Sequence, residues 1–396
     1  MRNLHFILSF SLVVFIFSCS SEKSEEKVSD SDIEFKFEIV DSLTVDYLGM
    51  PFLCDFSPNQ ERVLFFNGRN TEFIITNSEG EIIAQFSKEG DIPDNPGSLA
   101  DRPIFYDNNT IVVHGQKGIW AYNFEGENIW KIEREQPLGF WFSKNTGRSM
   151  YLMDSQHYFT VINYDQLVID ASTDSLYDNL RALKIVNRNA KSIEPIIPLE
   201  SFSRFLDGKG YQPSSMLPSN HVSGNEMVIS YPKEDLIYLY DWKNESFQLK
   251  DTFSLTIEPF YLDEGKERKS LEGQNGFVMG GKVGEAEVRG AYLMDEGKVL
   301  VQYNSGVKES ERQEPKMKKT SENSITLSMP DNIPKDLFQM YKDGKKYGKP
   351  FRSSIEIASL LYVDGDFLWF NKDQVALDVE DDYAVFYKTK LVKNND

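Results

Sequence analysis

The sequence predicts an all-β protein, and three observations support this prediction. Residues 63–86 are written again, with substitutions, at residues 111–132, and both copies end in an Asn-x-Glu-Gly-Glu turn, at Asn77 and at Asn123. Each copy consists of three short apolar runs separated by polar turns, the pattern of successive antiparallel strands. A hairpin of this kind recurs six times along the chain. Because a repeat of this length is typical of propeller blades, we expect a six-bladed β-propeller of four-stranded antiparallel blades, with seven blades as the alternative.

The chain begins with a predicted export signal. Arg2 precedes an apolar run from Phe6 to Phe17, and Ser18 and Cys19 follow. The run is too short to cross a bilayer, which disfavours a transmembrane protein. Residues 16–19 resemble a bacterial lipobox, although an ordinary signal peptide that ends at a cysteine is the alternative. We expect a signal peptide at residues 1–18, lipidation at Cys19, a disordered acidic tether at 19–32 and a propeller domain at 33–396.

The acidic residues of the chain indicate where the protein is located in the cell and which partners it can bind. Glu22, Glu25 and Glu26 lie close behind Cys19 and resemble the signals that send some lipoproteins to the cell surface. The expected address is therefore the outer membrane, on either its periplasmic or its outer face. A net charge of −19 disfavours nucleic acid and anionic lipid as partners. We expect membrane attachment through the lipid anchor, and either an envelope protein or an anionic glycan as the ligand.

The hairpins that begin the six blades are located by their turns, which are rich in Asp, Asn and Gly. These turns are residues 57–59, 107–109, 144–147, 223–225, 295–297 and 364–366. A third strand follows in each blade, ending at Asn77, Asn123, Asn163, Asp241, Gly344 and Lys388. The last blade lacks an outer strand at the C-terminus, and residues 35–40 are a spare strand at the N-terminus. We expect residues 35–40 to pair with residues 383–388 and close the ring, which removes an exposed edge.

Three stretches interrupt the repeats. Residues 174–206 are a predicted insertion of mixed character with a helix near residues 176–183. Residues 308–323 are charged and nearly devoid of apolar side chains, so we expect a mobile surface loop. The Gly-rich stretch 273–290 contains no nucleotide-binding fingerprint and is predicted to be a loop.

This layout resembles a family of bacterial lipoproteins with six-bladed, TolB-like propellers, the domain of unknown function 4221. The resemblance depends on the Cys19 start, the repeated strands and the blade-ending segment 86–97, which is similar to a Glu-Gly-Pro-Asn-Gly signature of that family. Asp91 and Ile92 separate Gly90 from Pro93, so this match is loose. The resemblance implies a fold and an address, and no activity or catalytic residues.

Residues that could carry out chemistry are sparse. His114, His157 and His221 have no second His or Cys at metal-ligand spacing, and no hydrolase or metalloprotease motif is present, so no metal and no cofactor is expected. Cys54 lies in an apolar run and is predicted to be a buried structural thiol rather than a nucleophile. Acidic residues 378–382 lack a calcium-loop pattern and are predicted to be a solvated turn. Three tryptophans, Trp120, Trp130 and Trp141, are predicted to pack between blades rather than to bind sugar.

Two sets of charged turn residues are candidate sites. Asp55, Asp107, Asp295 and Asp364 recur at the end of a first strand, where they either form an acidic ring for acid–base catalysis or cap their own turns. The turns between second and third strands carry basic residues, which should lie on the opposite face and either attract an anionic ligand or serve only as solvated turns. They are Arg69, Lys117, His157, Lys233 and Lys372, with Lys308 beginning the corresponding loop of the remaining blade.

The sequence therefore predicts a lipid-anchored propeller outside the cytoplasm that acts as a binding or scaffold protein. A polysaccharide hydrolase or lyase with its site in the propeller channel is the alternative, and it requires acids with perturbed pKa values around the channel. A structural partner of an envelope complex is a third interpretation, and it requires a large exposed apolar patch.

Overall fold

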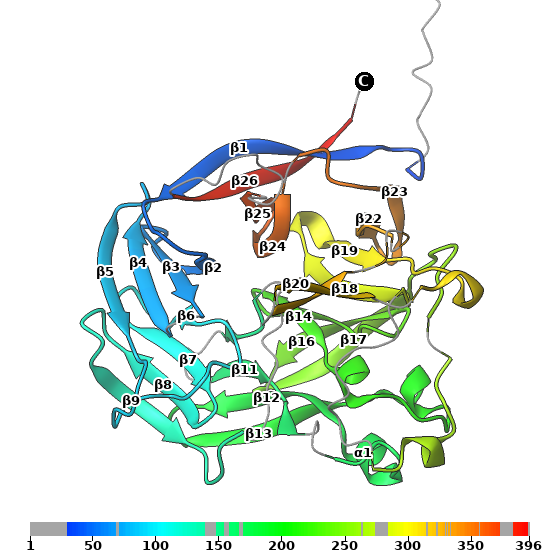
Figure 1. The fold of residues 1–396 in the computed structure, drawn as a ribbon, viewed down its shortest axis with the longest axis horizontal. Helices are drawn as coiled ribbons and strands as arrows, with labels where there is room; N and C mark the ends of the chain where they lie inside the picture. Colours follow the sequence, from blue (N-terminus) through cyan, green and yellow to red (C-terminus); the bar gives the residue numbers. More distant parts are fainter. Residues whose placement is uncertain are drawn as a thin grey trace, which may run out of the picture.

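A computed structural model shows a ring of six four-stranded antiparallel sheets around a central axis (Figure 1). The predicted six-bladed β-propeller is confirmed, and the seven-bladed alternative is wrong. The structure describes residues 30–68, 71–138, 148–153, 158–165, 169–262, 264–273, 284–313, 316–321, 324–328, 330, 332, 334–355, 357–372 and 383–394.

Five blades are built from successive stretches of chain, with the innermost strand first. They are β2 (Phe52–Phe56), β3 (Arg62–Asn67), β4 (Glu72–Asn77) and β5 (Ile82–Ser87) in blade 1; β6 (Ile104–Phe105), β7 (Ile111–Gly115), β8 (Gly118–Tyr122) and β9 (Asn128–Glu133) in blade 2; β10 (Tyr151–Leu152), β11 (Tyr158–Ile162), β12 (Arg181–Asn187) and β13 (Ser192–Pro198) in blade 3; β14 (Ser219–Ser223), β15 (Glu226–Ser230), β16 (Leu236–Lys243) and β17 (Ser246–Ser254) in blade 4; and β18 (Glu287–Leu293), β19 (Lys298–Asn304), β22 (Leu337–Lys342) and β23 (Lys345–Phe351) in blade 5.

The sixth blade joins the two ends of the chain. It contains β24 (Ile357–Asp364), β25 (Phe367–Lys372) and β26 (Ala384–Lys393), and β1 (Phe35–Val45) is its outer strand. The predicted closure by an N-terminal strand is confirmed, but its register differs from the prediction. Residues 35–39 pair with 389–393, and residues 41–45 lie opposite 384–388, with a bulge between Ile39 and Asp41.

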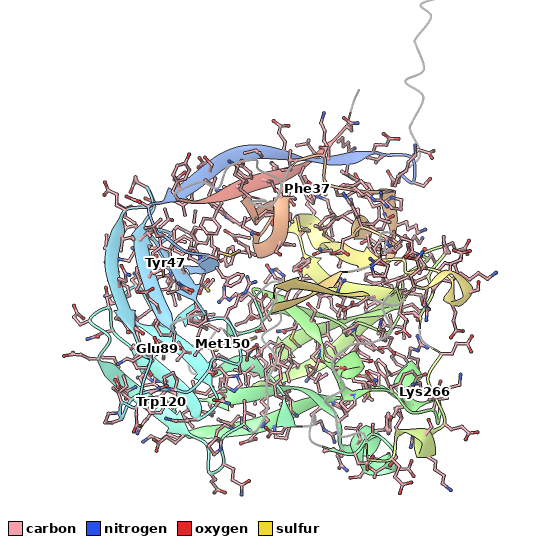
Figure 2. The ribbon with its side chains drawn as sticks, viewed as in Figure 1. Phe37, Tyr47, Glu89, Trp120, Met150 and Lys266 are labelled. Carbon is pink, nitrogen blue, oxygen red and sulfur yellow. The ribbon has the colours of Figure 1, made fainter. Side chains whose placement is uncertain are left out.

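Each blade packs on its two neighbours through an apolar layer. The buried apolar residues form one main cluster at each of the six junctions between blades. The middle strands are covered on both faces, and β8 is buried along its whole length. A ring of repeats has no terminal blade that needs a polar cap, so each blade packs on a neighbour on both sides. Figure 2 places Phe37 of β1 between the outer strand and the interior of the ring, where only 2% of its surface is exposed.

Blade 3 differs from its predicted layout. The run at residues 158–163 was expected to be a third strand, whereas the corresponding β11 is the second strand of the sheet order β10-β11-β12-β13. The predicted insertion at residues 174–206 supplies the helix α1 (Asp174–Asn179) and then β12 and β13, the third and outer strands. The first strand of this blade has only two residues, and a helix interrupts the blade, so the repeat is hard to recognise in the sequence. The second strand was therefore assigned as the third.

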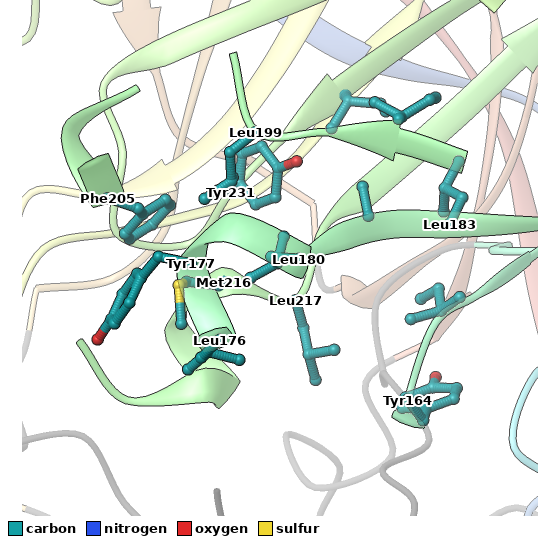
Figure 3. Packing of buried hydrophobic residues seen from close by; sticks show 14 of the residues in the cluster. Tyr164, Leu176, Tyr177, Leu180, Leu183, Leu199, Phe205, Met216, Leu217 and Tyr231 are labelled. Carbon is teal, nitrogen blue, oxygen red and sulfur yellow. The ribbon is translucent and has the colours of Figure 1, made fainter. Parts of the chain in front are cut away.

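The helix α1 extends the core between blades 3 and 4. Leu176, Tyr177 and Leu180 pack together with Phe205 and Met216 from the following segment (Figure 3). That segment contains the short 3-10 helices η2 (Arg204–Leu206) and η3 (Pro213–Met216), and further short 3-10 helices are η4 (Arg268–Leu271), η5 (Asp295–Gly297) and η6 (Glu309–Glu311). Among the described residues, no helix is long and apolar enough to cross a bilayer.

Two predicted loops contain strands. Residues 308–323 were expected to be a mobile loop, but they contain β20 (Lys316–Ser321), which pairs with β21 (Ser324–Ser328) in a separate two-stranded sheet. In the chain this hairpin follows β19 and precedes β22. The Gly-rich stretch 273–290 ends in β18, so Gly290 lies in an innermost strand. Backbone pairing can form a hairpin from a charged segment, and apolar content alone does not reveal it.

Candidate binding site on the propeller axis

Polar side chains in or beside several of the innermost strands join one blade to another near the axis. The first of these groups is an ion pair between Asp55, at the end of β2, and Arg148, just before β10. Arg148 Nη1 lies 2.8 Å from Asp55 Oδ1, and the backbone amide of Phe105 in blade 2 donates to Asp55 Oδ2 over 2.8 Å. Asp55 therefore links blades 1, 2 and 3.

Burial dominates the protonation of Asp55. It raises the pKa of Asp55 to about 6, against the lowering effects of Arg148 and of the backbone amides of Phe105 and Phe56. Asp364 contributes a smaller raising effect on the same pKa. The guanidinium of Arg148 also lies 4.8 Å from the ring centroid of Tyr151 and 5.9 Å from that of Tyr362, within the range of cation–π attraction.

A second buried group surrounds Asp101. Asp101 Oδ1 accepts a hydrogen bond from the Ser149 hydroxyl, and Asp101 Oδ2 lies 2.7 Å from His114 Nδ1. Tyr164 donates to the Ala100 carbonyl over 3.1 Å. Ser149 and His114 thus bond to the same carboxylate rather than to each other. Nucleophilic catalysis needs a serine bonded directly to its base, so this arrangement joins blades and does not form a catalytic triad.

His221 on β14 connects blades 4, 5 and 6. Its Nδ1 accepts from the Leu293 amide over 3.1 Å, and its Nε2 lies 3.4 Å from the Val363 carbonyl oxygen, which assigns the proton to Nε2. Burial, helped by the charge of Arg148 and opposed by the hydrogen bond to Val363, lowers the pKa of His221 to about 4. Both ring nitrogens are engaged by the backbone, so His221 is a neutral structural link at neutral pH.

A pocket lies on the axis among these groups. Its cavity volume is about 10 Å³, room for about one water molecule, and it is lined by Arg148, Tyr151, His221, Tyr292, Leu361, Tyr362 and Val363. Buried Arg102 borders it, donating to the carbonyls of Leu53 and Leu361 over 3.4 Å and 3.2 Å. Because Leu361, Tyr362 and Val363 are near the end of β24, and Tyr292 is near the end of β18, the pocket lies toward the face that carries the turns between first and second strands.

The structure separates the predicted basic turn residues. Lys117 is exposed between β7 and β8, and Lys308 is exposed before η6, whereas Lys372 is partly buried at the end of β25. Lys233 is buried, its ammonium donating to the Ala286 carbonyl over 2.8 Å and lying 3.4 Å from Glu285. Its charge is used inside the protein rather than on a face.

Two of the predicted basic residues, Arg69 and His157, lie outside the described residues. His157 follows β10 and precedes β11, so its place in the chain is between a first and a second strand. The prediction that it belongs with Lys117 on the second-to-third turns is therefore wrong, and the cause is the one-strand error in blade 3.

The four predicted aspartates differ in burial. Asp55 is buried in the channel wall, Asp107 is half-buried, and Asp295 and Asp364 are exposed at their turns. Asp107 accepts from the Asn109 amide over 2.8 Å, as an aspartate that caps its own turn does. The four aspartates therefore do not form a ring of buried acids: only Asp55 is buried, and the other three lie at their turns.

Other predicted residues have structural positions. Cys54 is a free, fully buried thiol whose pKa burial raises to about 12, which confirms the structural interpretation. Trp120 is buried in the layer between blades 1 and 2, and Trp130 packs between blades 2 and 3. Cys19, Trp141 and acidic residues 378–382 lie outside the described residues. No group of three or more His, Cys, Asp or Glu side chains in the described part of the chain is arranged to hold a metal.

Sequence reasoning missed the main pocket residues. Arg148 and Tyr151 border a predicted turn, Tyr292 follows a predicted loop, and Tyr362 is one of many strand tyrosines. Only the positions of these residues in the chain could have indicated the pocket. Each residue lies in or beside a first strand, and first strands line the axis of a propeller.

The fold and this site define a class of protein: a six-bladed β-propeller with a small polar and aromatic pocket on its axis. No protein-family model and no curated protein matches the sequence. The chain is similar in structure to a member of the domain-of-unknown-function-4221 family from Bacteroides vulgatus, with a TM-score of 0.58 and 12% identity over 92% of this chain and 100% of that one. It is also similar to a Bacteroides fragilis protein described as exported, with a TM-score of 0.54 and 13% identity over 93% of this chain and 98% of that one. The expected resemblance to the 4221 family is thereby confirmed at the level of the fold.

Proposed function

We propose that the protein is a lipid-anchored binding protein of the cell envelope, with its ligand on a propeller face. The axial polar side chains support binding over catalysis, since Asp55, Asp101 and His221 hold neighbouring blades together. His114 is engaged by Asp101 within blade 2.

The address comes from the chain start and from the fold. The apolar run before Cys19 has the pattern of an export signal, and the Bacteroides fragilis protein of similar fold is described as exported. Lipidation of Cys19 would place the propeller on a tether at the outer membrane, facing the periplasm or the cell surface.

The anchor is tested by changing Cys19 to Ala in the full chain. The variant should leave the membrane fraction for the soluble extracytoplasmic fraction, while the wild type resists a carbonate wash. Protease added to intact cells then distinguishes the two faces, because only surface-exposed protein is cleaved. A Cys19→Ala variant that stays with the membrane after the wash would show that lipid does not hold it there.

A polysaccharide hydrolase or lyase is the second candidate, and Asp55 is the observation that favours it. A buried channel acid whose pKa is raised to about 6 is suited to general acid catalysis. Both of its oxygens, however, already accept hydrogen bonds, from Phe56 and Arg148 on Oδ1 and from Phe105 on Oδ2. Release of reducing ends from envelope polysaccharide by the wild type, abolished in Asp55→Asn, would favour the enzyme.

A further inference from the structure

We propose that the outer edge of blade 5 docks on the anionic headgroup surface of the membrane that holds the lipid anchor. This proposal rests on the anchor proposed above and adds the orientation of the propeller at the membrane. The docking surface, called the basic edge below, consists of exposed basic side chains from the end of β22 to the residue after β23. They are Lys342, Lys345, Lys346, Lys349 and Arg352.

The basic edge differs in charge from the rest of the protein. Residues 342–352 contain five basic side chains and one acidic side chain, a net charge of +4, whereas the whole chain carries −19 and the remainder of it therefore −23. A net charge this negative disfavours anionic lipid for the protein as a whole. Charges in solution act over only about 8 Å at physiological ionic strength, so the local charge decides which side of the protein can approach an anionic surface.

The start of the propeller lies against the same edge. The backbone amide of Gly348 donates to the Asp30 carbonyl over 2.7 Å. The next amide, of Lys349, donates to the Ile33 carbonyl over 2.8 Å. The beginning of β1 is accordingly beside β23 (Figure 1). The segment that comes from the anchor therefore enters the propeller at the basic edge.

The length of chain before this point keeps the basic edge close to the bilayer. Asp30 is eleven residues after Cys19. Eleven residues span at most roughly 40 Å when fully extended, and a flexible coil of that length averages about 20 Å. A lipidated Cys19 would thus hold blade 5 nearer to the headgroups than the blades across the ring.

Most of the charge on the basic edge is available to a ligand. Within the part of the chain that the structure describes, the side chains of Lys345, Lys346 and Arg352 form no ion pair. Lys349 Nζ lies 2.8 Å from Glu34 Oε1, and both of these side chains are half exposed. Ammonium and guanidinium groups form charge-assisted hydrogen bonds with phosphate oxygens, which the headgroups of anionic lipids supply.

Docking through this edge leaves the propeller faces open. The strand β23 is the outermost strand of its blade, so the basic edge belongs to the outer wall of the ring. A propeller that rests on this wall stands edge-on at the membrane. Both of its faces then remain accessible to the ligand of the proposed binding function.

The test measures which lysines the membrane covers. The mature protein is coupled through Cys19 to a maleimide lipid in vesicles, and Cys54 does not compete because its thiol is buried. One set of vesicles is phosphatidylcholine alone, and the other is an equal mixture with phosphatidylglycerol. An amine-reactive reagent is added at low ionic strength, and mass spectrometry gives the rate of modification of each lysine.

We expect Lys345 and Lys346 to react at least about fivefold more slowly on the anionic vesicles, since one basic side chain near an anionic surface favours the docked state by about that factor. About 1 M salt should abolish the difference. The reference residues are Lys117 and Lys191, which are exposed in blades 2 and 3 and should react equally on both vesicles. Equal rates at Lys345 and Lys346 on the two vesicles, or equal slowing of the reference residues, would overturn the proposal.

Charge reversal tests the basic edge against a matched control. Lys345→Glu combined with Lys346→Glu should make Lys342 react equally on both vesicles. Lys117→Glu combined with Lys191→Glu changes the net charge by the same amount and should keep the wild-type difference at Lys342. All four substituted residues are exposed, so the melting temperatures should match that of the wild type.

The same result for both double variants would overturn the proposal and leave the lysines of β23 as protection for an exposed edge strand. Failure here is distinguishable from failure of the anchor. The maleimide lipid replaces natural lipidation in the vesicles, whereas fractionation of the Cys19→Ala variant measures lipidation in cells.

Discussion

The seam that closes the ring and the axis of the ring are held by different forces. At the seam, β1 pairs with β26 along both strands, and Phe37 packs against Phe338, Phe351 and Phe370 at centroid distances of 4.9, 5.2 and 5.2 Å. At the axis, Asp55, Arg148 and His221 join the blades through single directed bonds. Apolar burial and strand pairing stabilise the seam, whereas buried charge and one unpartnered hydroxyl cost stability at the axis. The comparison indicates that apolar burial at the seam stabilises the fold, whereas directed polar contacts join the blades at the axis.

Removing the closing strand should give the largest effect. Deletion of residues 20–42 takes away most of β1 and should lower the free energy of unfolding by several kcal/mol, since ring closure couples all blades and each Å² of buried apolar area contributes about 25 cal/mol. Urea unfolding measures it. Deletion of residues 20–29 alone is the control and should leave the transition unchanged. A ring that unfolds like the full protein without β1 would show that the seam is not what holds it.

A single side chain at the seam should have a large effect of its own. Phe37→Ala empties a site that is 2% exposed and should destabilise the protein by about 3–5 kcal/mol. Ile39→Ala, on the same strand but 41% exposed, should change stability by less than about 1 kcal/mol. Similar midpoints for the two variants in chemical denaturation would argue against a well-packed seam.

At the axis, two buried groups should respond to pH in opposite directions. The folded pKa of Asp55, about 6, is above its ordinary value of 3.8, so its contribution to stability is present below pH 3.8 and is lost as pH rises through 6. The folded pKa of His221, about 4, is below its ordinary value of 6.5, so its contribution is present above pH 6.5 and is lost as pH falls through 4. Each amounts to roughly 3 kcal/mol at most.

Variants separate the two contributions. The destabilisation caused by Asp55→Asn should shrink as pH rises from 4 to 6.5, and that caused by His221→Gln should shrink as pH falls over the same range. Unfolding free energies at several pH values measure both. If the destabilisation by both variants changed with pH in the same direction, one of the two pKa shifts would have the wrong sign.

The basic turns should give the smallest effect. Lys117→Glu changes an exposed turn and should alter stability by no more than about 0.5 kcal/mol, whereas Lys233→Glu places a carboxylate beside Glu285 and should destabilise clearly. Binding of an anionic glycan that Lys117→Glu weakens, and that salt also weakens, would revive the basic face as a ligand site. The absence of both effects would leave Lys117 a solvated turn residue.

The sequence by itself determined the architecture. Period-two apolar runs and Asp-, Asn- and Gly-rich turns encode strands and hairpins locally, so the repeats in blades 1 and 2 and the spare strand at Phe35 were enough to predict six blades and their closure. Cys54 could be placed in the core for the same reason, because its neighbours in the chain are apolar.

Only the tertiary structure decided the strand assignment in blade 3 and the composition of the site. The two-residue β10 leaves too short a pattern to read, and α1 separates β11 from the strand it pairs with. Arg148, His221, Tyr292 and Tyr362 come from four blades and meet only because the ring brings the first strands to a common axis. Contacts between residues so far apart in the chain depend on the geometry of closure, which no local pattern records.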